Sequence, residues 1–382
     1  MKITYVLPDP NFASAKGKGG RVSHALGVIN GIERNNIDIQ VLGEKNISRF
    51  YDGKNIRYIE GIPGGYLINT LIYAYKCLTI SSTNDSDAVL IRKSVGTLLL
   101  GILTFNFRLI KSPKNLFWEV NGYTFENYNT NIFGAALYNL SVLAHKILLR
   151  KSQGIYVVSD ALKEKISSGF FSINPEKITV IPNGGPNWKG FKKDEKKASK
   201  FIFFGVFQSY NDFSCVVEAF KLLKEKYSNV ELHFCGYGKE EAFIKEESRM
   251  DEDIYFWGSK VFDDLYNEGI ATKKSIGLIP LKEIGTSKIL SPIKMFEYIA
   301  LGMPIVISNA AKLPNDIDMK GLNFTYEAGN NIDLARVMGE ILENNSMWKN
   351  IESKSKTLVN ENNWTNRMEE LIKFINIKSV NN

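Results

Sequence analysis

The chain is poor in the residues that build disulfide frameworks and metal centres. Its 382 residues include only three cysteines, Cys77, Cys215 and Cys235, which lie far apart and form no Cys-x-x-Cys pair. Its three histidines are equally dispersed and show no spacing typical of metal ligands. We therefore expect reducing surroundings, no structural zinc site and no metal cofactor.

Long apolar segments are missing as well. The most apolar runs, residues 97–107 and 132–144, are shorter than the roughly 20 residues that a helix needs to cross a bilayer. The first residues, MKITYVLP, show no basic stretch, apolar stretch and cleavage site of a secretory signal. We expect a cytoplasmic protein.

Charge is distributed unequally along a chain whose length suggests two domains. Residues 1–180 hold 21 Lys and Arg against 13 Asp and Glu, which gives a net charge of +8, whereas the remaining residues have a net charge of −1. The basic half is either a solvated surface or one that meets an anionic partner, such as phospholipid, nucleic acid or a phosphorylated substrate.

Short apolar runs alternate with helical stretches in both halves, which predicts an α/β fold of two tandem Rossmann-like, doubly wound domains. The strands are expected at 3–7, 37–42, 88–91, 116–119, 154–158 and 178–181, and then at 201–205, 231–235, 254–257, 277–280 and 305–308. A turn is expected at residues 236–238. Ligands bind such sheets beyond the carboxyl ends of their strands, so we expect a cleft between the two domains.

The lysine-rich stretch 189–200 is typical of a linker. It separates an expected N-terminal domain, 1–188, which would bind the acceptor, from a C-terminal domain, 201–360, which would bind a nucleotide sugar. A final helix within 361–382 is expected to cross back to the first domain.

The stretch SPIKMFEYIALGMP, residues 291–304, predicts a capped helix. Ser291 suits the N-cap and Pro292 the first helical position, while Gly302 suits a C-cap and Pro304 cannot continue a helix. Lys294 and Glu297 are three residues apart and share one face of the helix. The lysine and the first-turn amides could bind a diphosphate, and the glutamate could accept hydrogen bonds from the ribose hydroxyls. The alternative is a surface ion pair.

This stretch resembles the donor-binding helix of family 4 of the retaining glycosyltransferases, in a variant with the pattern SPxKxFEYxAxGxP. The resemblance implies a GT-B fold and a hexosyltransferase in cell-surface polysaccharide synthesis. In that family a Glu-x7-Glu pair contacts the donor. Glu297 matches the second glutamate of this pair, but Ile289 occupies the position of the first. We therefore expect the main chain around residues 286–290 to make the contact with the donor sugar.

Two more segments resemble the same family. Residues 203–211 resemble its first C-domain strand and glycine turn, with Gly205 and Gln208 on the donor side. The family's diphosphate-binding Arg and Lys are missing there, so Gln208 and Asn211 also fit a plain turn. Residues 177–184 end in Pro-Asn-Gly and resemble its domain junction. These would be structural markers of a hinge.

Near the N-terminus, Gly19 and Gly20 precede a predicted helix, where glycines allow a phosphate to approach the backbone closely. By resemblance this loop closes over the donor, although solvated loops have similar sequences. The segment is neither a GxGxxG nor a Walker A sequence, which argues against a dinucleotide oxidoreductase.

Three polar residues end predicted strands of the first half. Arg92 follows one strand, while Glu119 and Asn121 end another. We predict that they form the catalytic side, with Glu119 as the one candidate proton acceptor. The alternative is a buried Arg92–Glu119 ion pair. Asp85-Ser-Asp87 is a DxD triplet, which we interpret as a turn.

The expected reaction transfers a sugar from a UDP- or GDP-sugar, with retention of configuration and without a metal, to a glycan or lipid-linked acceptor. No pair of carboxylates suits a double displacement, so orientation and stabilisation of the leaving diphosphate would drive transfer. The apolar run 66–80 either rests on the inner, anionic membrane face or is a core helix. The alternatives are a nucleotide-sugar epimerase and a non-catalytic nucleotide-sugar- or anion-binding protein; nucleic acid is disfavoured as a partner.

Overall fold

The computed structural model describes residues 1–12, 20–51, 53, 55–60, 66–83, 85–94, 113, 115–122, 143, 146–168, 172–191, 199–284, 292–311 and 318–380. The chain forms two compact units. The N-terminal unit comprises Met1–Ala15, His24–Pro182 and Trp364–Asn382, and the C-terminal unit comprises Lys16–Ser23 and Asn183–Asn363. Some residues that the sequence analysis singled out lie outside the described residues. They are Gly19, Ser291, residues 286–290 and, apart from one residue, the runs 97–107 and 132–144.

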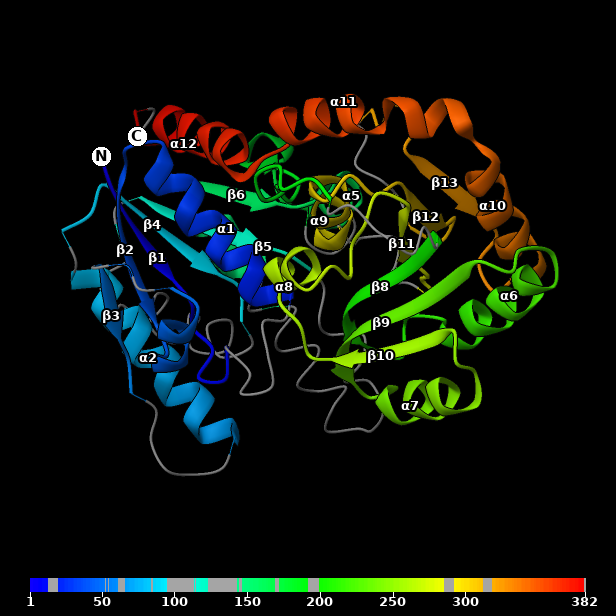
Figure 1. Ribbon diagram of the computed structural model, residues 1–382. Coiled ribbons are helices and arrows are strands. Elements are labelled where there is room, and N and C mark those ends of the chain that lie inside the picture. The colour runs from blue at the N-terminus through cyan, green and yellow to red at the C-terminus, as the bar shows by residue number, and fades with distance from the viewer. Residues whose placement is uncertain are drawn as a thin grey trace. The chain divides into compact units, whose positions relative to one another are not determined.

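The N-terminal unit is built on a seven-stranded, all-parallel sheet in the order β3-β2-β1-β4-β5-β6-β7 (Figure 1). The strands are β1 Lys2–Val6, β2 Asp38–Gly43, β3 Ile56–Tyr58, β4 Ala88–Arg92, β5 Leu116–Val120, β6 Gly154–Val157 and β7 Ile178–Val180. The helices are α1 Gly20–Arg34, α2 Tyr66–Thr83, α5 Asp160–Ser167 and α12 Trp364–Val380, with 3-10 turns η1 Lys45–Arg49 and η4 Pro175–Lys177. The central strands β1, β4, β5 and β6 are almost wholly buried, as expected for a parallel sheet covered on both faces.

Helix α12 packs closely against α1, and two glycines of α1 make this possible. A Cβ atom at Gly27 would lie 2.1 Å from the Trp364 indole, and one at Gly31 would lie 2.5 Å from the Met368 side chain. Trp364 also meets the His24 ring edge-on, with 5.1 Å between centroids. The end of the chain is therefore part of the N-terminal unit, with α12 beside α1 (Figure 1).

The C-terminal unit has a six-stranded parallel sheet in the order β10-β9-β8-β11-β12-β13. Its strands are β8 Ser199–Phe207, β9 Val230–Gly238, β10 Ile254–Gly258, β11 Ser275–Ile279, β12 Ile305–Ser308 and β13 Asn323–Tyr326. Its helices are α6 Phe213–Lys226, α7 Glu241–Met250, α8 Phe262–Asn267, α9 Ile293–Ala300, α10 Asn331–Glu343 and α11 Asn345–Glu361. The predicted α/β class with two tandem parallel sheets is confirmed.

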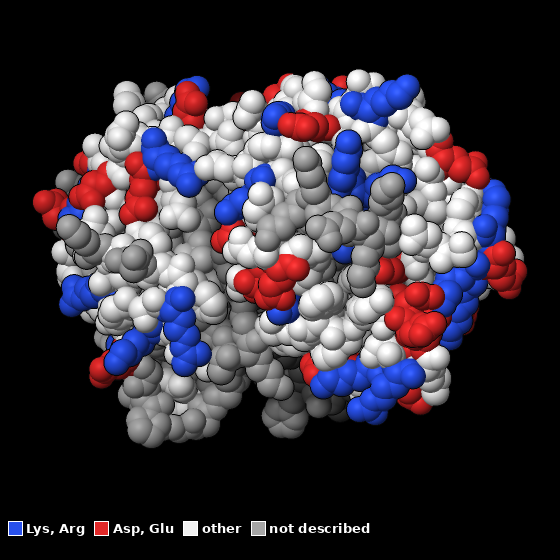
Figure 2. Space-filling view, in the orientation of Figure 1, with Lys and Arg blue, Asp and Glu red and all other residues white. Residues whose placement is uncertain are grey.

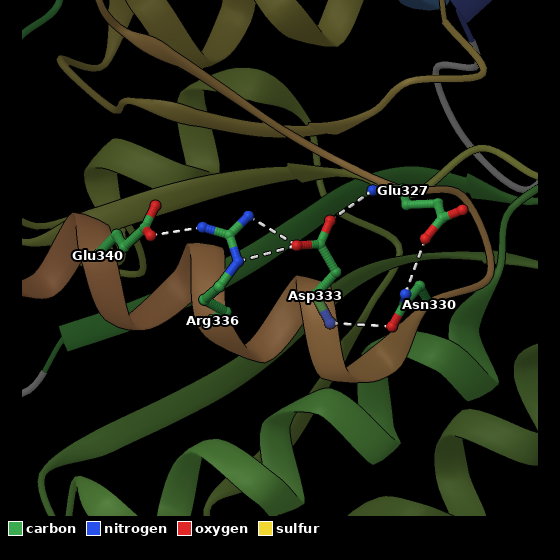
Figure 3. Close-up of polar contacts among 5 residues, drawn as sticks. All are labelled: Glu327, Asn330, Asp333, Arg336 and Glu340. Atoms are coloured by element: carbon green, nitrogen blue, oxygen red, sulfur yellow. Dashed lines mark hydrogen bonds and ion pairs between the residues drawn. The ribbon is translucent and has the colours of Figure 1, made fainter.

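The start of α10 shows how local sequence fixes a helix end in this unit (Figure 3). Asn330 caps the helix by accepting the amide of Asp333 at 3.0 Å, and Asp333 in turn accepts the amide of Glu327 at 2.8 Å. Arg336 binds the Asp333 carboxylate through two nitrogens, at 2.9 and 2.6 Å, and also Glu340 one turn on. The backbone bond from Glu327 and the Arg336 guanidinium lower the pKa of Asp333.

Three sequence predictions about secondary structure were wrong or incomplete. Residues 236–238 form no turn, because β9 continues to Gly238 in register with β8. A Cβ atom at Gly236 would lie 1.8 Å from the Gly205 carbonyl oxygen, so close pairing of these strands requires glycine. The short outer strands β3 and β13 were missed, and residues 199–200 of the expected linker belong to β8.

The surface carries both charge signs. Figure 2 shows that basic and acidic side chains are interspersed on this face among the described residues. None of the described helices combines the length and the apolar character needed to cross a membrane.

Candidate functional site

Helix α9 begins one residue later than predicted. Pro292 is the N-cap, with φ −68° and ψ 111°, and the helix runs from Ile293 to Ala300. Pro292 has an extended ψ, and its carbonyl accepts the Met295 amide at 3.1 Å, so the first helical residue is Ile293. No side chain among the described residues caps this helix, so the amides of Ile293 and Lys294 are available to an anion.

Tyr298 fixes the orientation of α9 on the sheet. Its hydroxyl accepts the Phe204 amide of β8 at 2.8 Å and donates to the Leu278 carbonyl of β11 at 3.3 Å. The ring packs over Gly277, where a Cβ atom would lie 2.2 Å from it. Helix α9 is thereby tied to the two central strands β8 and β11.

Lys294, in the first turn of α9, holds a cation close to β8. Its ammonium lies 3.9 Å from the centre of the Phe203 ring, and a Cβ atom at Gly205 would be 3.5 Å from Nζ. Within the described part of the chain, no hydrogen-bond acceptor or ion-pair partner contacts this ammonium. Burial lowers the pKa of Lys294 to about 7, against the opposing effect of Glu297. An anion bound at this point would supply the missing counter-charge.

Gly205 lies close to Lys294, and Glu297 follows Lys294 three residues later on α9. Gly205 has φ +136° and sits inside β8 rather than in a turn after it, since the strand continues to Phe207. Glu297 is buried, one turn beyond Lys294 on α9. The structure therefore brings together the predicted donor residues Gly205, Pro292, Lys294 and Glu297, while their roles stay predictions.

Gln208 and Asn211 lie in a tight turn between β8 and α6. The Asn211 amide donates to the Gln208 carbonyl at 3.0 Å, and its side chain donates to the same oxygen at 3.3 Å. Asp212 then caps α6 through the Cys215 amide. The backbone contacts fit the plain-turn alternative for Gln208 and Asn211.

The N-terminal unit collects a second set of charges around Glu119. Arg92 and Glu119 are directly paired across β4 and β5, and their side chains meet at 3.1 Å. The Tyr5 hydroxyl donates to the other carboxylate oxygen at 2.6 Å, and His24 Nε2 lies 3.0 Å from the first. The Asn121 side chain also donates to Glu119. Glu119 itself is fully buried.

This environment stabilises the ionised form of Glu119. Burial alone would raise the pKa of the carboxyl, but His24, Arg92 and the hydrogen bonds from His24 and Tyr5 lower it to about 2. A carboxylate with so low a pKa and no exposed surface is a poor proton acceptor. The geometry therefore matches the buried ion pair that the sequence left as an alternative, and a catalytic role for Arg92, Glu119 and Asn121 stays a prediction.

Sequence reasoning missed Tyr5 and His24 as partners of Glu119. Tyr5 comes from β1, and His24 comes from α1, almost a hundred residues before the carboxylate. Only the strand order β1-β4-β5 brings the tyrosine and the carboxylate together, because the register places both on one face. A tyrosine in the first strand was the one available signal.

The remaining predicted features are Gly20 and the DxD triplet. Gly20 is the first residue of α1, and a Cβ atom there would meet nothing within 4 Å. Asp87 of the DxD triplet accepts the Lys2 amide at 2.7 Å, at the amino end of β1. Across the described ranges, no group of three or more His, Cys, Asp and Glu side chains could hold a metal ion.

Comparisons with known proteins agree with this architecture. Residues 198–344 match the family described as "Glycosyl transferases group 1". The matched stretch contains β8 to β13 and α9, so the similarity to this family lies within the C-terminal unit. No curated protein sequence matches the chain.

Several solved structures share the whole fold. HepE of Anabaena in complex with UDP is 12% identical with a TM-score of 0.70, and the match covers 98% of this chain and 100% of HepE. Sucrose-phosphate synthase of Thermosynechococcus elongatus is 12% identical with a TM-score of 0.74, over 100% of both chains. The lipopolysaccharide outer core galactosyltransferase WaaB is 14% identical with a TM-score of 0.67, over 99% of this chain and 100% of WaaB. These likenesses show that the chain has the GT-B glycosyltransferase fold.

Proposed function

We propose that the chain is a retaining glycosyltransferase that moves a hexose from a nucleotide diphosphate sugar, with UDP-sugars as the favoured donors, to a glycan or lipid-linked acceptor. The observation that carries the proposal is the ammonium of Lys294, half-buried at the start of α9 and without an anionic partner among the described residues. The match of residues 198–344 to a glycosyl transferase family supports it. HepE, a structural neighbour, binds UDP and UDP-glucose.

In this proposal the C-terminal unit binds the donor. The Lys294 ammonium and the first-turn amides of α9 bind the diphosphate and stabilise the charge that develops as the sugar leaves. Gly205, which has no side chain, lets the diphosphate approach the lysine. Glu297 accepts hydrogen bonds from the ribose. The buried Glu119 keeps β1, β4 and β5 in register, so that the residues after these strands are held in place.

Thermal shift measurements with UDP, GDP, UDP-glucose, UDP-galactose, UDP-N-acetylglucosamine and GDP-mannose test donor binding, because a ligand that binds only the folded state raises the Tm. We expect one nucleotide and its sugar to stabilise the wild type but not Glu297→Ala. Glu246→Ala, an exposed glutamate of α7, is the matched control and should behave as the wild type. If no nucleotide raises the Tm, the donor assignment is wrong.

Transfer itself is tested by incubating the stabilising sugar nucleotide with candidate glycans and analysing the product. We expect the anomeric configuration of the donor to be retained, as seen by NMR, and transfer to continue in the presence of a chelator. Inversion of the anomeric centre would contradict the proposed reaction course.

A second candidate function, a non-catalytic nucleotide-sugar-binding protein, is favoured by one feature of the sequence. Gln208 occupies the region where the family has a basic, diphosphate-binding side chain, and Ile289 occupies the position of a glutamate that contacts the donor sugar. In that case a nucleotide would raise the Tm, but no acceptor would yield product and no UDP would be released.

We further propose that the protein works on the cytoplasmic face of the membrane. Helix α2 contains no acidic residue, and its Ile68 and Tyr75 side chains are 58% and 48% exposed. Apolar and aromatic side chains of this kind bind the interface of a bilayer. Sedimentation with anionic vesicles should fall in the Ile68→Ser/Tyr75→Ser variant, and equal sedimentation of the variant would refute the membrane contact.

A further inference from the structure

The strands β8 and β11 are neighbours at the point where the strand order of the C-terminal sheet reverses. From β8 the chain proceeds to β9 and β10 on one side, and from β11 to β12 and β13 on the other. The two strands are in register over three residue pairs, the last of which is Gly277 opposite Ile202. Strand β8 nevertheless continues to Phe207 and β11 to Ile279. The sheet therefore opens between them before their carboxyl ends, where open α/β sheets bind ligands.

The hydroxyl of Tyr298 takes the place of the next hydrogen bond between these strands. In the paired part, the Lys200 amide donates to the Lys274 carbonyl at 3.2 Å. Bonds of a parallel ladder recur at alternate residues, so the Phe204 amide and the Leu278 carbonyl, four residues further along each strand, would form the equivalent bond. Instead, the Phe204 amide donates to the Tyr298 hydroxyl at 2.8 Å, and this hydroxyl donates to the Leu278 carbonyl at 3.3 Å. The tyrosine is inserted between the strands and holds them apart.

The same face of α9 places Lys294 over the next part of β8. Lys294 and Tyr298 are four residues apart on the helix, so their side chains are neighbours. The hydroxyl of Tyr298 binds the backbone of Phe204, while the ammonium of Lys294 lies 3.9 Å from the Phe203 ring centre and 3.5 Å from a Cβ atom built at Gly205. Three consecutive residues of β8 thus meet two side chains of α9. Because Tyr298 is fully buried, its hydrogen bonds determine how α9 lies on the strand.

We propose that Tyr298 is a positioning residue for the donor diphosphate: its hydroxyl, inserted between β8 and β11, sets the position of the Lys294 ammonium above Gly205. The role in donor binding rests on the proposed function, whereas the effect on the ammonium follows from the contacts of Tyr298 alone. Without the hydroxyl, α9 loses these hydrogen bonds to both strands. The Phe204 amide and the Leu278 carbonyl are then left to pair directly, and the first turn of α9 is no longer held on β8.

The pH dependence of Lys294 acetylation, measured by competitive labelling and mass spectrometry without any nucleotide, tests this positioning. Only the uncharged amine reacts, and burial lowers the pKa of Lys294 to about 7. In Tyr298→Phe we expect water to reach the ammonium, so that the midpoint of labelling rises towards the ordinary value of 10.5. Each unit of this rise slows labelling below the midpoint about tenfold.

Two variants of the same unit separate positioning from stability. The buried Ser308 hydroxyl donates to the Leu281 carbonyl at 2.7 Å. Ser308→Ala therefore also removes a buried hydrogen bond and should lower the Tm as Tyr298→Phe does, although this bond involves neither α9 nor β8. The Tyr326 hydroxyl is buried and has no hydrogen-bond partner among the described residues, so Tyr326→Phe should leave the Tm almost unchanged. Both controls should keep the labelling midpoint of Lys294.

A risen midpoint in Tyr298→Phe, with both controls unchanged, is the expected result. If Tyr298→Phe lowers the Tm as Ser308→Ala does but keeps the midpoint, Tyr298 only stabilises the fold and the proposal is overturned. An equal rise in Ser308→Ala would overturn it too. Trimethylamine N-oxide, which favours the folded state, is added to all proteins so that each variant is labelled while folded.

The affinity for UDP is measured separately on the same proteins. We expect Tyr298→Phe to raise the Kd about tenfold, as for a weakened charge-assisted bond, and the two controls to bind as the wild type does. Equal affinity of Tyr298→Phe and the wild type would contradict the role in donor binding. If UDP does not bind the wild type while the labelling midpoint still rises in Tyr298→Phe, the donor assignment is wrong and the positioning of Lys294 by Tyr298 is upheld.

Discussion

The two units treat a buried charge in opposite ways. In the N-terminal unit, Glu119 is fully buried and contacts Tyr5, His24, Arg92 and Asn121. In the C-terminal unit, the Lys294 ammonium faces the Phe203 ring, and no carboxylate of the described residues forms an ion pair with it. A charge whose partners are all within the protein stabilises the fold, while a charge without them is suited to a ligand. The comparison explains why the most prominent carboxylate of the sequence is not the best candidate for chemistry.

The largest expected effect is on stability, in the Glu119→Gln variant. Loss of the carboxylate leaves Arg92 buried without its counter-charge, and we expect the free energy of unfolding to fall by about 3–5 kcal/mol in urea titrations. The control is Glu268→Gln, because Glu268 pairs with Lys260 but is 39% exposed, and such pairs contribute about 0–1 kcal/mol. If Glu119→Gln is as stable as the wild type but has lost transfer activity, Glu119 has a catalytic role and the contrast between the two units is wrong.

The next effect is on ligand affinity, in Lys294→Met. A charge-assisted bond to a diphosphate contributes about 1.5–3 kcal/mol, so we expect the Kd for UDP to rise roughly ten- to a hundredfold. The Tm of the free protein should stay the same or rise, since a partly buried cation has been removed. Lys221→Met, which breaks a surface pair with Glu247, should leave the Kd unchanged. Loss of stability without loss of affinity would make Lys294 structural.

The stability of the protein at acid pH tests whether the ionised Glu119 stabilises the fold. The pKa of Glu119 is about 2 in the folded protein, below its ordinary value of 4.5. Its stabilisation is therefore complete above pH 4.5 and is lost as the pH falls towards 2. We expect urea titrations of the wild type to show this loss and those of Glu119→Gln to show a smaller one. Identical pH profiles would mean that the ion pair contributes nothing to acid stability.

The smallest expected effect comes from Gly205→Ala. The φ of +136° is strained for alanine, and the new methyl group would lie 3.5 Å from the Lys294 ammonium, so we expect about 1 kcal/mol less stability. Gly258→Ala, at φ +67° with nothing within 4 Å, is the matched control for strain alone. Only Gly205→Ala should also weaken UDP binding, and equal UDP affinity of the two variants would contradict the placement of the diphosphate.

The difference between the two regions also explains what the sequence could predict. The start of helix α9 was predicted to within one residue, because Ser-Pro at the start and a glycine with a proline two residues later at the end are local signals. The strands β8 and β11 were found from their apolar residues. The strands β3 and β13 were missed because they are short, lie at sheet edges and expose Arg57, Tyr58 and Thr325, so they lack an apolar run.

The partners of charged residues were harder to predict than the elements that carry them. Glu119 and Arg92 were paired as an alternative because both end predicted strands, but Tyr5 and His24 required the strand order and the position of α1. The turn expected at 236–238 failed for a related reason. Glycine usually signals a turn, whereas here Gly236 lets β9 approach the backbone of β8.

The most direct test of the account is to count the protons taken up when UDP binds, by titration calorimetry at pH 8 in buffers with different ionisation enthalpies. With a pKa of about 7 in the free protein, Lys294 is mostly uncharged at this pH and must gain a proton when it binds a diphosphate. We predict uptake of about 0.9 proton per UDP for the wild type and almost none for Lys294→Met. Equal uptake by the two proteins would show that Lys294 does not bind the diphosphate, and would contradict the assignment of the donor site to the start of α9.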